Sequence, residues 1–205
     1  GVVGNDWYEN INGSKMYCVM DTSVRGVGTT TSVGQMSAKN LKATTFGDEL
    51  KFANNYRSKV FGISIKDRGA ILSAGHVADA AYWLDSKEGN FISSTYYIDE
   101  LPNWVKVFNK KDLVTQYLNQ TWTNSISTEI LEKYTDADNG SYERIFKGKS
   151  TPTFPYDLKS LRNDNKDKEL IATTPFGNSF LVNFAEELIK NEKLGNNPAN
   201  VTDAL

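Results

Sequence analysis

The sequence predicts an α/β fold in which a central, mostly parallel sheet is flanked by helices and carries a polar insertion. A helical pattern at 45–53 is followed by a short, fully apolar strand at 60–65. Strands without polar alternation are typical of sheets that helices cover on both faces. A second helical pattern, at 179–190, has the spacing of a helix with one buried face.

The composition is that of an ordinary globular protein. With 205 residues, the chain is long enough for one substantial hydrophobic core, and we treat 1–205 as a single domain. The net charge of −2 argues against nucleic acid as a partner, because no basic face is required. No apolar run approaches the roughly 18 residues of a membrane-spanning helix, so no membrane partner is expected.

The first expected elements are a strand, a loop and a helix. Residues 16–21 are predicted to form a strand, and 22–35, which are rich in Gly, Thr and Ser, a flexible loop. The helix at 45–53 has a capping pattern at its start. Its spacing places three apolar side chains on one face: Phe46, Leu50 and Ala53.

The middle of the chain contains further short elements. Residues 70–72 and 80–84 are short apolar segments, and a turn followed by a strand is predicted at 89–97. A short helix is predicted at 101–109, with Pro102 near its first turn. Proline is favoured there because an amide hydrogen at that position would have no partner in the helix.

The helix at 179–190 is the clearest in the sequence. Asn178 or Ser179 can cap its N-terminus. The last residues, 202–205, resemble the start of another strand. One stripe of the helix is apolar, as expected for a face that packs on a core: Phe180, Phe184 and Leu188, widened by Leu181.

The character of the chain changes between 110 and 168. Charged and polar residues become more frequent, and Pro152, Pro155 and many Asp and Asn residues interrupt any regular period. We interpret 110–168 as an insertion or lid within the domain, because no second hydrophobic pattern marks a separate one.

Cys18 and His76 are the only residues of their kinds. A single cysteine excludes an internal disulfide and a cysteine-based zinc site, so a buried thiol is expected. Most catalytic zinc sites use two or three histidines, which argues against a zinc site built wholly within this chain. The same shortage argues against a Ser-His-Asp triad, although one histidine is formally enough.

The strand at 60–65 is followed by two cations, Lys66 and Arg68. On an extended backbone, alternate side chains point to the same side, so both cations can converge on one anion while Asp67 points away. Ligands of open α/β sheets bind beyond the carboxyl ends of the strands. A lysine beside a forked guanidinium suits a phosphoryl group or another tetrahedral oxyanion. A solvated charge cluster is the alternative.

A series of short motifs lies in order along nearly the whole chain: Gly4–Tyr8, Ser37–Leu41, Lys66–Leu72, Gly75-His76, Ala80–Trp83, Ser94–Tyr97, Leu101-Pro102-x-Trp104 and Thr174–Asn178. Together they resemble the alkaline phosphatase superfamily. The resemblance is strongest to its monomeric, threonine-nucleophile branch, often described as type I phosphodiesterase/nucleotide pyrophosphatase. An alkaline-phosphatase-like α/β fold is therefore expected.

The resemblance implies roles for three residues in a zinc-dependent phosphate monoester hydrolase. Asn5 would contact one phosphoryl oxygen, and Lys66 and Arg68 the others, which neutralises charge during transfer. The alternative for Asn5 is a turn residue that satisfies its own backbone. His76 is interpreted as a structural hydrogen-bonding residue. Four aromatic side chains are interpreted as part of the core or walls: Tyr82, Trp83, Tyr96 and Tyr97.

The resemblance also implies what the chain lacks. The nucleophilic threonine and one zinc-binding aspartate of the family would precede residue 1, and the remaining Asp and His ligands would follow residue 205. The chain is thus expected to be a partial domain, inactive when isolated. The parent enzyme would hold two zinc ions, none of them bound fully by these residues, and would be periplasmic or secreted.

Two rival functions stay open. A phosphodiesterase or nucleotide pyrophosphatase of the same superfamily is one, although the Lys66 and Arg68 pair favours the extra charge of a monoester. A catalytically inactive binding or structural module with this fold is the other. The expected partner is a small phosphate ester, and exposed sheet edges would favour self-association of the fragment.

Overall fold

The chain forms two compact units in a computed structural model that describes residues 4–11 and 13–205. Unit 1 comprises residues 1–85, 90–111 and 181–205, and unit 2 comprises 86–89 and 112–180. The long helix α7 (Pro175–Glu192) contributes residues to both. The predicted polar excursion, 110–168, falls largely within the residues of unit 2.

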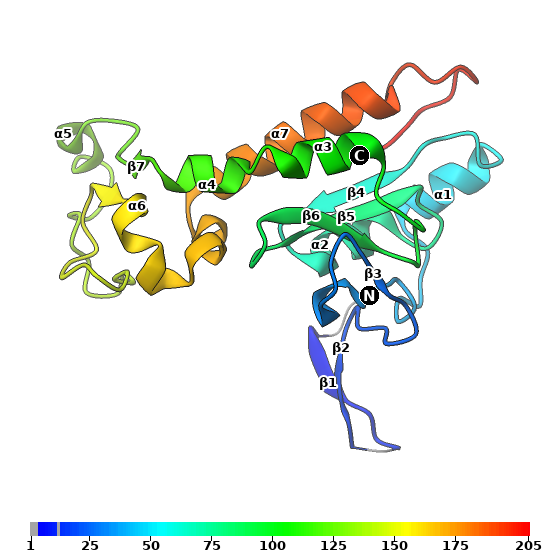
Figure 1. The fold of residues 1–205 in the computed structure, drawn as a ribbon, viewed down its shortest axis with the longest axis horizontal. Coiled ribbons are helices and arrows are strands. Elements are labelled where there is room, and N and C mark those ends of the chain that lie inside the picture. The colour runs from blue at the N-terminus through cyan, green and yellow to red at the C-terminus, as the bar shows by residue number, and fades with distance from the viewer. Residues whose placement is uncertain (1–3, 12) are drawn as a thin grey trace. The chain divides into compact units, whose positions relative to one another are not determined.

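Unit 1 is built on a mixed four-stranded sheet (Figure 1). Strands β4 (Phe61–Ser64) and β5 (Ala80–Asp85) are parallel, whereas β5 with β6 (Asn90–Ser94) and β6 with β3 (Gly26–Val27) are antiparallel. The α/β class is confirmed, but parallel pairing does not predominate among the described strands. Only residues 86–89 connect β5 to β6, and so short a connection permits antiparallel pairing alone. The strand order is β3, β6, β5 and β4.

Helices cover both faces of this sheet. Helix α2 (Asp67–Ala74) lies on one face, and α3 (Asn103–Lys110) lies on the other with residues 181–192 of α7 (Figure 1). The side chains of β5 alternate accordingly. Trp83 belongs to a core cluster with Ile71 of α2, whereas Tyr82 packs edge-on against Phe184 of α7.

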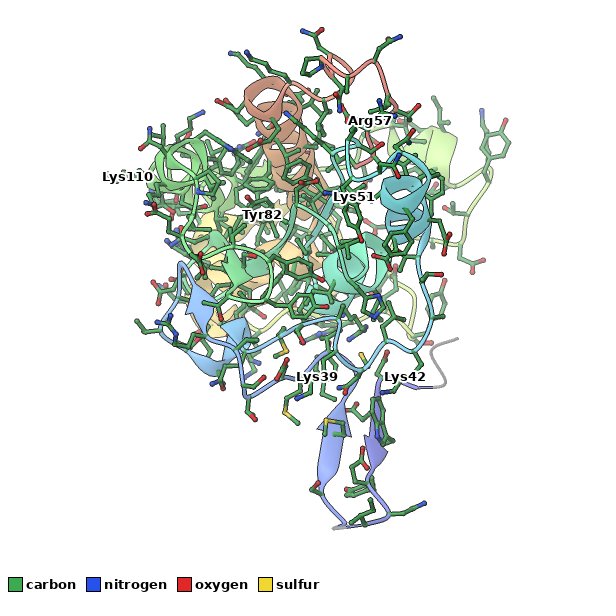
Figure 2. All side chains as sticks on the ribbon, turned by 90° about the vertical axis from the view of Figure 1, so that its right-hand side faces the viewer. Lys39, Lys42, Lys51, Arg57, Tyr82 and Lys110 are labelled. Atoms are coloured by element: carbon green, nitrogen blue, oxygen red, sulfur yellow. The ribbon has the colours of Figure 1, made fainter. Side chains whose placement is uncertain are left out.

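Aromatic rings fill the layer between the sheet and α7. The rings of Phe91 and Phe184 stack with centroids 3.9 Å apart, and Tyr82 lies in the interior beside them (Figure 2). The predicted stripe of Phe180, Phe184 and Leu188 is buried. The predicted start of the helix is wrong, however, because α7 begins at Pro175 rather than at 179. Proline is well suited to the first position of a helix.

Two earlier expectations for the first helix have different outcomes. Helix α1 (Phe46–Ala53) is confirmed, with a capping box between Thr45 and Asp48. Its apolar face is not turned inward, because Phe46 is 73% exposed while Asp48 and Lys51 are buried. Both inward side chains have partners: Asp48 binds backbone amides, and Lys51 pairs with Asp79 at 2.8 Å. Satisfied polar groups can therefore take the inner face.

An N-terminal hairpin extends away from the rest of unit 1 (Figures 1 and 2). Its antiparallel strands are β1 (Asp6–Tyr8) and β2 (Lys15–Tyr17), so the strand predicted at 16–21 is only partly formed. The loop predicted at 22–35 contains β3 and a 3-10 turn, η1 (Ser32–Gly34). Pairing with β6 accounts for β3, and that pairing is not encoded locally.

The other predicted elements are found close to their expected places. Strand β6 and helix α3 confirm the strand and helix predicted at 89–97 and 101–109. Near the C-terminus, Ala204 forms a parallel bridge with Val60 beside β4, as the strand-like pattern of 202–205 indicates. No described helix is both long and apolar enough to cross a membrane.

Unit 2 has its own packed interior of short elements. The ring of Trp122 stacks on Tyr156 with centroids 5.1 Å apart, and Phe146 and Phe154 meet Tyr156 edge-on. Hydrophobic packing thus orders a segment whose sequence shows no regular period. Its elements are α4 (Leu113–Leu118), β7 (Thr121–Trp122), α5 (Thr128–Leu131), β8 (Tyr156–Asp157), α6 (Leu158–Leu161), η2 (Asn163–Asn165) and η3 (Asp167–Thr173).

Candidate functional site

The two predicted cations lie where the sheet gives way to α2. Strand β4 ends at Ser64, Lys66 is the extended N-cap residue of α2, and Arg68 is in the first turn of that helix. The expectation of an extended backbone through Arg68 is therefore wrong. Successive side chains of a helix are separated by about 100° rather than 180°, so Asp67 does not point away from Arg68.

A tyrosine connects these side chains. The hydroxyl of Tyr17, in β2, donates to Asp67 Oδ1 at 2.6 Å and accepts a hydrogen bond from Arg68 Nη1 at 3.2 Å. The same Asp67 oxygen also accepts from the backbone amide of Arg68 at 2.6 Å. Fifty residues separate Tyr17 from Asp67, and no local pattern identified Tyr17 as a member of the site.

Asn5 comes to the same region through the hairpin. Its carbonyl accepts a hydrogen bond from the amide of Cys18 at 2.9 Å, and the strand that follows pairs Asp6 with Tyr17. The residue is exposed to solvent. The hairpin thus brings Asn5 beside the residue that follows Tyr17, although more than sixty positions separate it from Arg68.

The two cations differ in their surroundings. Lys66 is exposed, and no carboxylate of the described residues lies within ion-pair distance of its Nζ atom. Arg68 is half-buried and is held through Tyr17 rather than by a direct ion pair with Asp67. Positive charge at the N-terminus of a helix is unfavourable by itself, so this arrangement suits an anion at the same place.

Tyr17 is neutral over the working range of most enzymes. Burial, followed by the hydrogen bond to Asp67, raises the pKa of its phenol to about 12. Burial and the charge of Asp67 also raise the pKa of the Cys18 thiol. The prediction of a buried thiol is confirmed, and a thiol of this kind is not an activated nucleophile.

His76 is a structural residue, as predicted. Its Nδ1 atom lies 3.0 Å from Asp48 Oδ2 and its Nε2 atom lies 3.1 Å from the carbonyl of Leu41. The hydrogen bond to Asp48 is the main reason that the pKa of its imidazole is raised. Both ring nitrogens are engaged with protein groups, so neither is directed at a ligand.

Metal ligands are not gathered in the described part of the chain. No three His, Cys, Asp or Glu side chains among residues 4–11 and 13–205 are grouped as a metal ion would require. The residues that the structure describes therefore do not form a zinc site by themselves.

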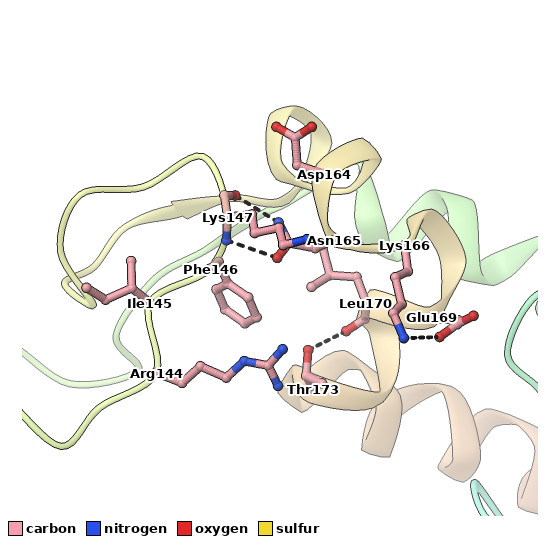
Figure 3. A pocket seen from close by; sticks show the side chains of 10 residues that line it. All are labelled: Arg144, Ile145, Phe146, Lys147, Asp164, Asn165, Lys166, Glu169, Leu170 and Thr173. Atoms are coloured by element: carbon pink, nitrogen blue, oxygen red, sulfur yellow. Dashed lines mark hydrogen bonds and ion pairs between the residues drawn. The ribbon is translucent and has the colours of Figure 1, made fainter.

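Unit 2 contains a separate pocket of about 270 Å³ (Figure 3). Asn165 anchors one wall by hydrogen bonds to both backbone groups of Lys147. Lys166 is offset by Glu169, whose carboxylate lies 3.7 Å from its ammonium group. Charged side chains of both signs line this pocket, and none of the predicted site residues is among them. We therefore place the candidate site at the start of α2.

Comparisons with known proteins identify several relatives. No family model matches the chain. A protein named calcium-transporting ATPase from Myroides odoratus is 52% identical over 207 residues, and alkaline phosphatase PhoV from Synechococcus elongatus is 47% identical over 195. Alkaline phosphatase PafA from Elizabethkingia meningoseptica is 44% identical over 199 residues. These matches cover at least 95% of this chain but only 35–37% of the relatives.

Solved structures give the same picture. The crystal structure of wild-type alkaline phosphatase PafA superimposes with a TM-score of 0.91 at 43% sequence identity. The match covers 98% of this chain and 38% of that one. A PafA variant with one Thr→Ser substitution and with alanine in place of an asparagine, a lysine and an arginine also matches with a TM-score of 0.91, at 41% identity. It covers 100% of this chain and 39% of that one.

Proposed function

Because the chain belongs to the alkaline phosphatase superfamily, we propose that it forms the phosphate-binding part of a phosphate monoester hydrolase. The observation that carries this proposal is the placement of Lys66 and Arg68 at the N-terminus of α2, with Asn5 brought to the same region by the hairpin. Two cations, an amide and a helix N-terminus together suit a tetrahedral anion.

Each of the three side chains has a distinct role in this proposal. The amide group of Asn5 donates a hydrogen bond to one non-bridging phosphoryl oxygen. Lys66 supplies a point charge, and the guanidinium of Arg68 supplies directed donors for two oxygens. Charge moves onto these oxygens as the phosphoryl group is transferred, so fixed donors lower the barrier.

The PafA variant supports this assignment. The lysine and arginine that were replaced in it lie two positions apart, as Lys66 and Arg68 do, and its replaced asparagine precedes that lysine by about sixty positions, as Asn5 does. The fourth substitution, of a threonine, has no counterpart that far upstream within these 205 residues.

The remaining machinery is assigned to segments outside this chain. We infer that the threonine nucleophile and the ligands of two zinc ions belong to the longer protein, because the chain covers little more than a third of its relatives. The chain's own residues then bind and orient the phosphoryl group. An exported, periplasmic or secreted location is part of the same proposal and follows from the family resemblance alone.

Three other functions have a basis in the resemblance or in the comparisons. A phosphodiesterase or nucleotide pyrophosphatase would use the same cations on a less charged group. The relative from Myroides odoratus is named a calcium-transporting ATPase, which favours including ATP among the substrates tested. An inactive module would bind phosphate without turnover.

The test is made in the full-length protein with Lys66→Ala and Arg68→Ala. Removing one charged donor should lower kcat/KM for a chromogenic phosphate monoester by about 10²–10³-fold. The effect should be smaller for a diester, which has one charge fewer. Turnover of ATP and calcium uptake into vesicles are measured in parallel.

Lys110→Ala is the matched control. Lys110 is an exposed lysine of α3 at the periphery of unit 1 (Figure 2) and should leave kcat/KM unchanged. Loss of thermal stability in Lys66→Ala and Arg68→Ala with unchanged kcat/KM would contradict the assignment. Calcium uptake that depends on ATP would favour the transport function instead.

A further inference from the structure

Arg68 has an unusual anchor for an arginine. Its guanidinium contacts the hydroxyl of Tyr17 at 3.2 Å, and no described carboxylate lies within 4.0 Å of it in an ion pair. A free arginine side chain has many rotamers, and restricting them costs conformational free energy. Whatever holds Arg68 before a ligand arrives therefore reduces the cost of binding.

Tyr17 is itself held firmly. Its backbone is paired with Asp6 in the hairpin, and its ring packs on the core cluster beside α2. Its hydroxyl hydrogen is directed to Asp67 at 2.6 Å. The hydroxyl has one hydrogen, so only its lone pairs are left to face Arg68. Because the Tyr17 hydroxyl donates to Asp67, it must accept the hydrogen bond from Arg68.

The Tyr17 hydroxyl also separates the Arg68 guanidinium from the Asp67 carboxylate. A carboxylate in direct contact with Arg68 would neutralise the guanidinium and compete with a bound phosphoryl group. The neutral phenol accepts the hydrogen bond from Arg68 instead, so the charge of Asp67 acts on the guanidinium only across the intervening hydroxyl. Because burial and Asp67 raise the pKa of Tyr17 to about 12, the phenol keeps its hydrogen at moderately alkaline pH.

We propose that Tyr17 is a positioning residue that orients Arg68 toward the substrate phosphoryl group and takes the place that a direct ion pair with Asp67 would otherwise occupy. The inference rests on the proposed function, since it assumes that Arg68 binds that group. It assigns to Tyr17 a role that is exerted through Arg68 rather than on the substrate itself.

The experiment is a double-mutant cycle in the full-length enzyme with Tyr17→Phe, Arg68→Ala and the pair. Tyr17→Phe keeps the ring and removes only the hydroxyl. We expect it to lower kcat/KM for a phosphate monoester about tenfold, the effect of one hydrogen bond to a charged group. When Arg68 is already replaced by alanine, Tyr17→Phe should change kcat/KM less than twofold. Tyr17→Phe should also raise the inhibition constant of inorganic phosphate when Arg68 is present, and should leave it unchanged in the Arg68→Ala enzyme.

Tyr97→Phe is the matched control. The Tyr97 hydroxyl donates to the carbonyl of Gly75 at 2.9 Å, so this change removes one hydrogen bond of a half-buried tyrosine in the same unit. It should lower thermal stability without lowering kcat/KM. An equal loss of kcat/KM from Tyr97→Phe would mean that stability alone explains the effect of Tyr17→Phe, which would overturn the proposal.

The remaining outcomes distinguish a failure of the role proposed for Tyr17 from a failure of the proposed phosphate-binding function. If Arg68→Ala lowers kcat/KM but Tyr17→Phe adds the same loss in both backgrounds, Tyr17 does not act through Arg68. If Arg68→Ala has no effect, the proposed function itself fails. Should Tyr17→Phe not fold, Asp67→Asn tests the same chain of contacts: its loss of kcat/KM must vanish in the Arg68→Ala background.

Discussion

At the scale of single residues, Asp48 shows how a buried charge is satisfied. Its side chain is fully buried, and its two oxygens accept hydrogen bonds from the amides of Thr45, His76 and Val77 and bind the ring of His76. Burial opposes ionisation, but these hydrogen bonds outweigh it and lower the pKa of the carboxyl. The pair ties the start of α1 to the segment after α2.

The pair predicts how stability depends on pH. The pKa of His76 is raised above 6.5, so its contribution is complete below pH 6.5 and is lost as pH rises through the higher folded value. The pKa of Asp48 is lowered from 3.8, so its contribution is present above pH 3.8 and is lost as pH falls through the lower folded value. Urea unfolding of the unsubstituted chain and of His76→Gln at several pH values measures how much His76 contributes to the free energy of unfolding near neutral pH.

The difference between the two proteins should shrink as pH rises above the neutral range. A difference that stays constant from pH 5 to 9 would contradict a charged His76 in the folded state. Asp48→Asn should cost about 1–3 kcal/mol near neutral pH, because it replaces a charged acceptor among buried amides. A cost below a few tenths of a kcal/mol would show that the hydrogen bonds are dispensable.

At the scale of elements, the contact between β4 and α2 sets the position of the site. Gly62 lies in β4, and a Cβ atom there would stand 2.7 Å from the Cβ of Ala74 and would also overlap the carbonyl of Ala70. Only glycine allows α2 to approach the strand so closely. The start of α2, with Lys66 and Arg68, depends on that approach.

Gly62→Ala is therefore predicted to lower both stability and activity. The extra methyl group must displace backbone atoms of α2, which should cost about 1–3 kcal/mol in the free energy of unfolding. In the full-length enzyme, kcat/KM for a monoester should fall as the cations move. Gly140→Ala is the control, since an added Cβ there meets only side-chain atoms of exposed Tyr142 and of Glu143. Equal effects of the two changes would contradict the prediction.

At the scale of the whole molecule, unit 1 is a sheet with helices on both faces, and its candidate site lies at the start of α2 (Figure 1). Asn5, Lys66 and Arg68 supply donors and positive charge, whereas no described group of side chains supplies metal ligands. The matched region makes up only 35–37% of the relatives' length. The proposed function therefore gives this chain the binding of the phosphoryl group and leaves the nucleophile and the metal ligands to the rest of the longer protein.

The isolated 205-residue chain is predicted to be inactive. With or without added zinc, it should hydrolyse a chromogenic phosphate monoester no faster than the blank, because binding donors alone generate no nucleophile. The full-length protein, assayed beside it, should show zinc-dependent turnover. Turnover by the isolated chain that Lys66→Ala abolishes would mean that it contains a complete site. Light scattering of the same sample tests the expected self-association.

Much of the architecture was predictable from local pattern. The capping box and spacing of α1, the strand β6, the proline at the start of α3 and the apolar stripe of α7 are all found where the sequence indicates them. The ordered motifs were enough to identify the superfamily, and Cys18 and His76 have the structural states that their numbers and neighbours suggested. Periodicity, capping and turn chemistry act within a few residues, so a sequence records them directly.

Only the tertiary structure decided the rest. The pairing of β3 with β6 and of β4 with β5, and the inward turn of Asp48 and Lys51 in place of Phe46, depend on partners far along the chain. So does Tyr17, whose hydroxyl meets residues some fifty positions away. The physical reason is that a polar side chain takes the place in which all its hydrogen bonds are satisfied, and those partners are assembled only when distant segments pack.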